Sequence, residues 1–132
     1  GLSQTLSLMS AKIENSFVFV NLIDTDQKYG HRQDPDGFGE SLQEIDRALP
    51  AMLNKLDEGD ILIFLGDHGN DPTDNSTDHT REFVPLIAVS GSQKPGKDLG
   101  VRGTFSDVAA TALEFFEVEN SLPGTSFLKK VK

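Results

Sequence analysis

Cysteine is absent from this 132-residue chain, and its absence removes several kinds of chemistry at once. Without thiols the chain can form no disulfide, no thiolate zinc site and no cysteine nucleophile. No apolar run approaches the ~20 residues that a membrane-spanning helix needs. The first residues also lack the pattern of a signal peptide. These absences predict a cytoplasmic location and no membrane partner.

Basic side chains are scarce. Twelve Lys and Arg face twenty-one Asp and Glu, which gives a formal net charge of −9. Such a surface repels phosphate backbones, so we expect no nucleic-acid partner. Where Asp residues gather beside His, a bound cation would relieve the repulsion.

The chain has the length of one domain, and its 36% hydrophobic content with nine Phe favours a globular fold. Residues Ser16 to Ile23 (SFVFVNLI) predict a buried strand, and a polar loop follows from Asp24 to Gly39. Ile61 to Leu65 and Val84 to Val89 predict two further strands.

Two stretches have helical periodicity. From Glu40 apolar residues recur at spacings of three and four until Gly59, with Pro50 expected to kink the helix or remove one of its hydrogen bonds. After a loop from Ser90 to Gly103, Thr104 is expected to cap a last helix. The expected inner faces are Leu42, Ile45, Leu49, Met52, Leu53 and Leu56 in the first helix, and Phe105, Val108, Ala109, Ala112, Leu113 and Phe116 in the second.

The strand–helix–strand order over residues 17–65 predicts a βαβ unit with a right-handed crossover, and hence a parallel α/β sheet. In open α/β sheets, sites form beyond the carboxyl ends of the strands. The loops after the first two strands hold all three histidines of the chain and several acids, namely Asp24, Asp26, His31, Asp67, His68, Asp71, Asp74, Asp78 and His79.

Imidazole and carboxylate groups are suitable ligands for divalent ions such as Zn²⁺ and Mn²⁺. Two such ions ~3.5–4 Å apart can clamp the attacking and leaving oxygens of a phosphoryl transfer. Five candidates are too many for one open site and about right for two. They are Asp26, His31, Asp67, His68 and His79.

Other interpretations of these residues remain open. An Asp-His-Gly after a strand is often a turn with a capping Asp. Arg32 and Arg81 either neutralise a phosphate or form surface ion pairs. Serine hydrolysis lacks its G-x-S-x-G elbow, and three serines that we considered look like helix, turn or capping residues: Ser41, Ser76 and Ser106.

Three stretches resemble the phosphopentomutase family of the alkaline phosphatase superfamily: NLIDTDQKYGHRQDPDGFGESLQEID, LGDHGNDPTDNSTDHTREFVPLIAVS and RGTFSDVAATALEFF. The resemblance implies a three-layer α/β/α core with a parallel sheet. It also implies an isomerase that interconverts α-D-ribose 1-phosphate and ribose 5-phosphate, and their 2-deoxy forms, through a phosphothreonine. Two Mn²⁺ ions are implied, one held by Asp26, His31 and His79, the other partly by Asp67 and His68.

The same resemblance implies that residues 1–132 are the C-terminal part of the core domain. The nucleophilic threonine, the second ion's remaining Asp and the cap domain lie in an N-terminal part outside this chain. Thr73, Thr77 and Thr80 belong to the metal-loop motif, so no catalytic residue is assigned here. The alternatives are another mutase or phosphatase of the superfamily, such as a cofactor-independent phosphoglycerate mutase, and a non-catalytic metal-binding domain.

Overall fold

The computed structural model describes residues 1–92 and 96–132, so the loop expected over Ser90 to Gly103 lies partly outside the described residues. The chain forms two compact units. The first comprises Gly1–Leu56 with Leu65–Leu86, and the second comprises Asp57–Phe64 with Ile87–Lys132. Among the described residues, no helix has both the length and the apolar content to cross a bilayer.

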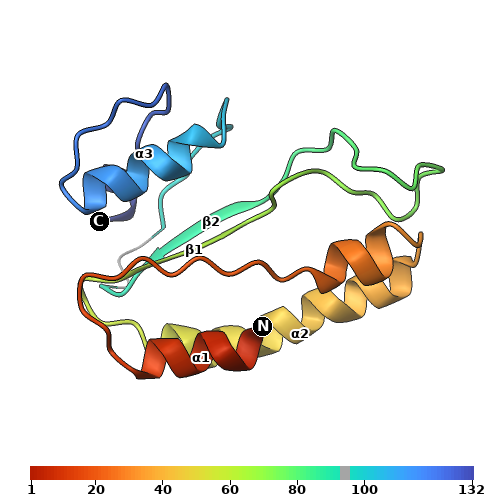
Figure 1. The fold of residues 1–132 in the computed structure, drawn as a ribbon, viewed down its shortest axis with the longest axis horizontal. Helices are drawn as coiled ribbons and strands as arrows, with labels where there is room; N and C mark the ends of the chain where they lie inside the picture. Colours follow the sequence, from red (N-terminus) through yellow and green to blue (C-terminus); the bar gives the residue numbers. More distant parts are fainter. Residues whose placement is uncertain (93–95) are drawn as a thin grey trace. The chain divides into compact units, whose positions relative to one another are not determined.

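Three helices build the first unit: α1 (Leu2–Ser10), the π-helix η1 (Thr25–Gly30) and α2 (Pro35–Leu53). Asp34 caps α2, because its Oδ1 accepts a hydrogen bond from the Gly37 amide at 2.9 Å. Helix α1, which the sequence analysis did not anticipate, contacts α2 (Figure 1). The Lys55 ammonium ties the two helical segments by donating to Ser10 Oγ at 2.5 Å.

The expected limits of the long helix were wrong. Helix α2 begins at Pro35, inside the predicted loop, because Asp34 and Pro35 form a favourable start that the apolar pattern from Glu40 does not reveal. It passes through Pro50 and ends at Leu53. Met52 is buried as expected, whereas Leu42 is 49% exposed and does not belong to the packed face.

The strand predicted over residues 16–23 was also wrong. Residues 16–22 adopt neither helix nor strand, and the side chains from Phe17 to Val20 are exposed. A strand exists only where its backbone groups pair with a neighbour. The segment therefore has the composition of a strand without a partner among the described residues.

The strands β1 (Ile61–Leu65) and β2 (Leu86–Ser90) form a two-stranded sheet. The limits of β1 are those expected, and β2 begins two residues later than expected, after Pro85. Backbone bonds from Gly66 to Pro85 at 3.3 Å and from Gly91 to Asp60 at 3.0 Å show that the pair is antiparallel. The predicted βαβ unit is absent from the described residues because its first strand is not formed.

Helices α3 (Ser106–Phe115) and α4 (Leu128–Val131) belong to the second unit. The predicted cap at Thr104 was wrong by one residue: Phe105 occupies the N-cap of α3 and makes no side-chain capping bond. Thr104 lies just before the cap, where its Oγ1 accepts from the Ser106 amide at 3.2 Å. The predicted inner face was only partly right. Phe105, at 55%, and Ala109 are exposed, whereas the other four predicted residues are half-buried: Val108, Ala112, Leu113 and Phe116. The buried residues of α3 are Asp107, Ala110 and Thr111.

The C-terminal segment explains this rotated face. The Phe127 amide donates to Thr111 Oγ1 at 3.0 Å, and the Thr125 amide donates to Asp107 Oδ1 at 2.7 Å. Phe127 itself is 2% exposed, so it is a central core residue of this unit. Polar side chains of α3 thus face inward because the tail supplies their partners.

Candidate metal centre

The π-helix η1 brings two predicted ligands onto one side. The His31 amide donates to the Asp26 carbonyl at 3.0 Å, five residues back, which is the hydrogen bond that defines a π-turn. In this wide turn the two side chains approach each other, and His31 Nε2 lies 3.4 Å from Asp26 Oδ1. A π-turn of this kind often marks a functional position.

The loop after β1 supplies the remaining candidates. Gly69 and Thr80 form an isolated antiparallel bridge, with the Thr80 amide donating to the Gly69 carbonyl at 3.0 Å. This bridge returns the chain beside itself. As a result the rings of His68 and His79 stack, with centroids 3.5 Å apart and 16° between their planes.

A single carboxylate oxygen, Asp26 Oδ1, faces all three imidazoles. It lies 3.4 Å from His31 Nε2, 3.5 Å from His79 Nε2 and 4.0 Å from His68 Nε2. Asp67 Oδ1 lies 3.5 Å from His68 Nε2, on the edge of the group. All five candidate ligands therefore come together within the first unit.

The backbone orients two of the rings. His31 Nδ1 lies 2.5 Å from the Thr77 carbonyl, and His68 Nδ1 lies 3.1 Å from the Gly69 carbonyl. A carbonyl only accepts, so each Nδ1 is the donor, and in the neutral ring this leaves the lone pair on Nε2. This is the usual outer-sphere arrangement of a metal-binding histidine.

The spacing of the donor atoms suits a metal ion. Ligand atoms about 2.0–2.2 Å from one ion lie roughly 2.8–3.6 Å from each other. The donors of Asp26, His31 and His79 all lie within 4.8 Å of one another, and two of their separations are 3.4 and 3.5 Å. Asp67 and His68 supply only two donors, so a second ion would need a further ligand.

Other acids of these loops have different partners. Asp24 accepts from Lys28 Nζ at 2.7 Å, which raises the pKa of the lysine. Asp71 accepts from Thr73 Oγ1 at 2.7 Å and from the Thr73 amide at 2.9 Å, and these bonds lower the pKa of Asp71. Neither acid joins the imidazole group. The structure therefore separates local turn-forming acids from the cluster.

Arg32 and Arg81, the two candidate phosphate partners, are both exposed, and neither forms an ion pair with another residue that the structure describes. Of the three serines considered for hydrolysis, Ser76 belongs to a turn, in which the Asp78 amide donates to its Oγ at 3.1 Å. Ser41 and Ser106 lie in α2 and α3.

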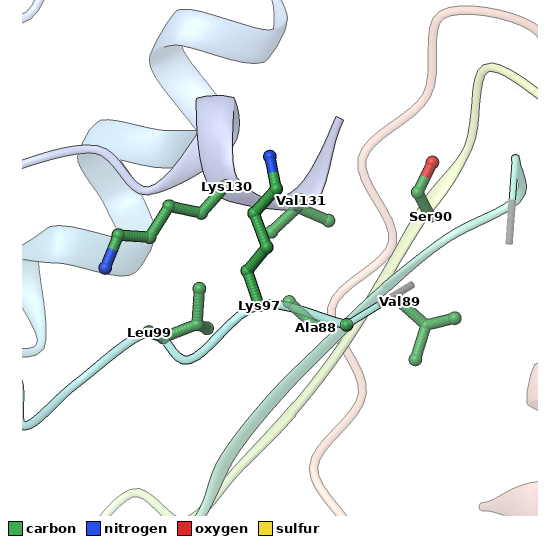
Figure 2. Close-up of a pocket in the computed structure, with 8 residues that line it drawn as sticks. Ala88, Val89, Ser90, Lys97, Leu99, Lys130 and Val131 are labelled. Carbon is green, nitrogen blue, oxygen red and sulfur yellow. The ribbon is translucent and has the colours of Figure 1, made fainter. Parts of the chain in front are cut away.

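A separate cavity of about 240 Å³ in the second unit has no comparable chemistry. Lys97, Lys130 and the buried Ser90 line it, but the Lys130 ammonium and the Ser90 hydroxyl point away from each other (Figure 2). The lysine donates instead to the Asp98 carbonyl at 2.9 Å, and Ser90 Oγ lies 3.0 Å from Ser92 Oγ.

The sequence analysis overlooked Asn70, whose Nδ2 donates to Asp26 Oδ1 at 3.1 Å. It stands two residues after His68, and that proximity was the available signal. Gly30 lies beneath it and is buried. A Cβ on Gly30 would overlap Asn70 Nδ2 and lie 2.7 Å from Cγ, so glycine leaves the space that the amide occupies.

The chain is similar to curated proteins over nearly its whole length. The chain is 51% identical over 121 residues to the phosphopentomutase of Dictyoglomus turgidum, covering 92% of this chain and 31% of that protein. It is 50% identical to the phosphopentomutase of Anaeromyxobacter dehalogenans and 46% identical to that of Caldanaerobacter subterraneus, each over 99% of this chain and 33% of the relative. The chain thus spans about a third of the curated relatives it matches.

The metalloenzyme superfamily model matches residues 2–120, nearly the whole chain. This chain therefore belongs to the metalloenzyme superfamily.

Proposed function

We propose that residues 1–132 are the C-terminal part of the core domain of a phosphopentomutase. The whole enzyme would interconvert α-D-ribose 1-phosphate and ribose 5-phosphate, and their 2-deoxy forms. Two facts support this together: identity near 50% to proteins named phosphopentomutase, and the convergence of three imidazoles on one oxygen of Asp26. This convergence of imidazoles on Asp26 is the observation that supports a metal-dependent reaction.

The proposed centre holds two Mn²⁺ ions. Asp26, His31 and His79 would bind one ion, and Asp67 with His68 would bind the second together with an Asp outside this chain. When bound, such ions polarise a transferring phosphoryl group and stabilise the alkoxide of a nucleophile. The nucleophile in this proposal is a threonine outside residues 1–132.

The residues of this chain would bind the cations and offset their positive charge. Asp26 supplies the negative charge that offsets bound cations, and the Thr77 and Gly69 carbonyls keep the His31 and His68 rings in place. His79 is 48% exposed and Asp67 is 68% exposed at their side chains, so the cluster has an open side that a phosphate can approach. Arg32 and Arg81 are the exposed cations available to neutralise that phosphate.

The rest of the proposed enzyme completes the fold. An N-terminal part would add the strands of a three-layer α/β/α core with a parallel sheet, and a cap domain would hold the sugar. The substrates are soluble metabolites of the cell interior, so we place the enzyme in the cytoplasm.

The test uses the whole enzyme with Mn²⁺. We expect conversion of ribose 1-phosphate to ribose 5-phosphate, and Asp26→Asn to abolish this activity and to weaken Mn²⁺ binding measured by electron paramagnetic resonance. Asp71→Asn is the matched control, because Asp71 lies in the same region but its carboxylate bonds Thr73. Conversion of phosphoglycerates in place of pentose phosphates would contradict the substrate assignment, and Mn²⁺ binding equal to wild type in Asp26→Asn would contradict the metal centre.

A further inference from the structure

Asn70 makes the one amide hydrogen bond described to the oxygen that all three imidazoles face. Its Nδ2 donates to Asp26 Oδ1 at 3.1 Å, and it belongs to the loop after β1, whereas Asp26 belongs to η1. The bond therefore links the two segments that supply the cluster. An amide donor does this without adding charge of either sign.

The packing around Asn70 also supports a role in holding Asp26. The Asn70 amide lies directly over the buried backbone of Gly30, with a hypothetical Gly30 Cβ placed 2.7 Å from its Cγ and 2.9 Å from its Oδ1. Gly30 is the last residue of η1, which also contains Asp26, and His31 follows it directly. Any larger residue there would push the amide away from Asp26.

We propose that Asn70 is the positioning residue of the metal centre: it fixes the rotamer of Asp26 so that Oδ1 stays aimed at the imidazole nitrogens, and Gly30 provides the space it needs. This inference rests on the proposed function, because it concerns the same site. A carboxylate without the amide could turn about its χ angles, and the donor set would lose its spacing.

The experiment measures Mn²⁺ affinity in the whole enzyme, from the paramagnetic resonance signal of free Mn²⁺. Asn70→Leu keeps the side-chain size and removes the donor, and we expect affinity to fall about 10–100-fold, as for other outer-sphere partners. Asn75→Leu is the matched control, an exposed asparagine of the same loop, and should bind Mn²⁺ as the wild type does.

Gly30→Ala provides an independent arm. It should displace the Asn70 amide and lower Mn²⁺ affinity to a similar degree. In an Asn70→Ala background, where the amide is gone and the short side chain leaves room for the added Cβ, Gly30→Ala should add nothing, since the two changes then remove one interaction. Additive losses, or affinity unchanged in Asn70→Leu, would overturn the role of Asn70.

Three further outcomes are informative. A purely structural role for Asn70 would lower the unfolding temperature of the metal-free enzyme and leave affinity intact, which would also overturn the inference. If Asn70→Leu does not fold, Asn70→Ser, polar but too short to reach Asp26, replaces it with the same expected loss. Failure of the wild-type enzyme to bind Mn²⁺ would overturn the metal centre itself, and so is distinct from failure of the Asn70 variants alone.

Discussion

Asp26 and Asp107 both have several polar partners, but their surroundings suit them to different roles, ligand binding and structural hydrogen bonding respectively. Asp26 faces imidazole nitrogens at the partly open cluster. Asp107 is 5% exposed and receives the Thr125 amide and Arg102 Nε, each at 2.7 Å. The first arrangement leaves donor atoms available to a ligand, whereas the second uses its oxygens to hold the protein together.

The hydrogen bond from the Thr125 amide, reinforced by Arg102, lowers the pKa of Asp107 despite burial. A carboxyl with a lowered native pKa contributes stability above its unfolded pKa of about 3.9, and that stability is lost as pH falls through the native value. We therefore expect Asp107→Asn to cost about 2 kcal/mol at pH 7. The cost should shrink as acid protonates the wild-type carboxyl.

Hydrogen exchange of the amides of α3 and residues 124–127, followed from neutral to acidic pH, measures this cost. Asp71→Asn is the control, because the pKa of Asp71 is also lowered but the side chain bonds only a neighbouring turn residue. A cost that stayed equal at every pH would refute the assigned role of the Asp107 charge.

At the scale of elements, several hydrogen bonds hold the C-terminal segment against α3. Thr111 Oγ1 accepts from the Phe127 amide while donating to the Asp107 carbonyl at 2.7 Å. Arg102 Nη2 donates to the Thr125 carbonyl at 2.6 Å. Gly124 permits the approach, since a Cβ there would overlap the Ser106 carbonyl. Backbone and side-chain bonds together fix how the tail lies.

Phe127 anchors this docking. Phe127→Ala should cost about 3–5 kcal/mol, because it removes a fully buried ring and leaves a cavity. Phe105→Ala, at the 55%-exposed start of α3, should change stability by less than about 0.5 kcal/mol. Exchange protection of α3 amides measures both, and equal effects of the two substitutions would contradict the packing described.

At the scale of the whole molecule, apolar side chains of the first unit remain uncovered. Phe17 is 66% exposed and Phe19 is 76% exposed, and both lie in a strand-like segment that has no strand partner among the described residues. Contiguous exposed apolar residues usually mark a surface that another segment covers. In the proposed enzyme, the N-terminal part would cover it.

Dye binding tests this expectation. Residues 1–132 alone should bind a hydrophobic fluorescent dye strongly, and the double substitution Phe17→Ser, Phe19→Ser should reduce that binding. The whole enzyme should bind little dye with or without the substitutions. Equal dye binding by the whole enzyme and the isolated chain would show that the segment stays uncovered.

The sequence predicted correctly those features that depend on residues close together in the chain. Strand β1 was located to the residue because its apolar run is bounded by Asp60 and Gly66, both local signals. The start of α2 was missed because the capping of Asp34 and Pro35 was overlooked in favour of apolar periodicity. The five candidate ligands were identified by residue type and loop position, whereas Asn70 has no such chemical signature.

The amino-acid sequence by itself determined the absence of thiol chemistry, the acidic charge, and the gathering of every histidine in two short loops, because these are properties of composition and order. Only the tertiary structure decided that β1 and β2 pair antiparallel, that α3 buries Asp107 and Thr111, and that Asp26 Oδ1 is the oxygen facing three imidazoles. The physical reason is that strand partners, buried helix faces and side-chain convergence depend on contacts between residues far apart in the chain, which local periodicity does not encode.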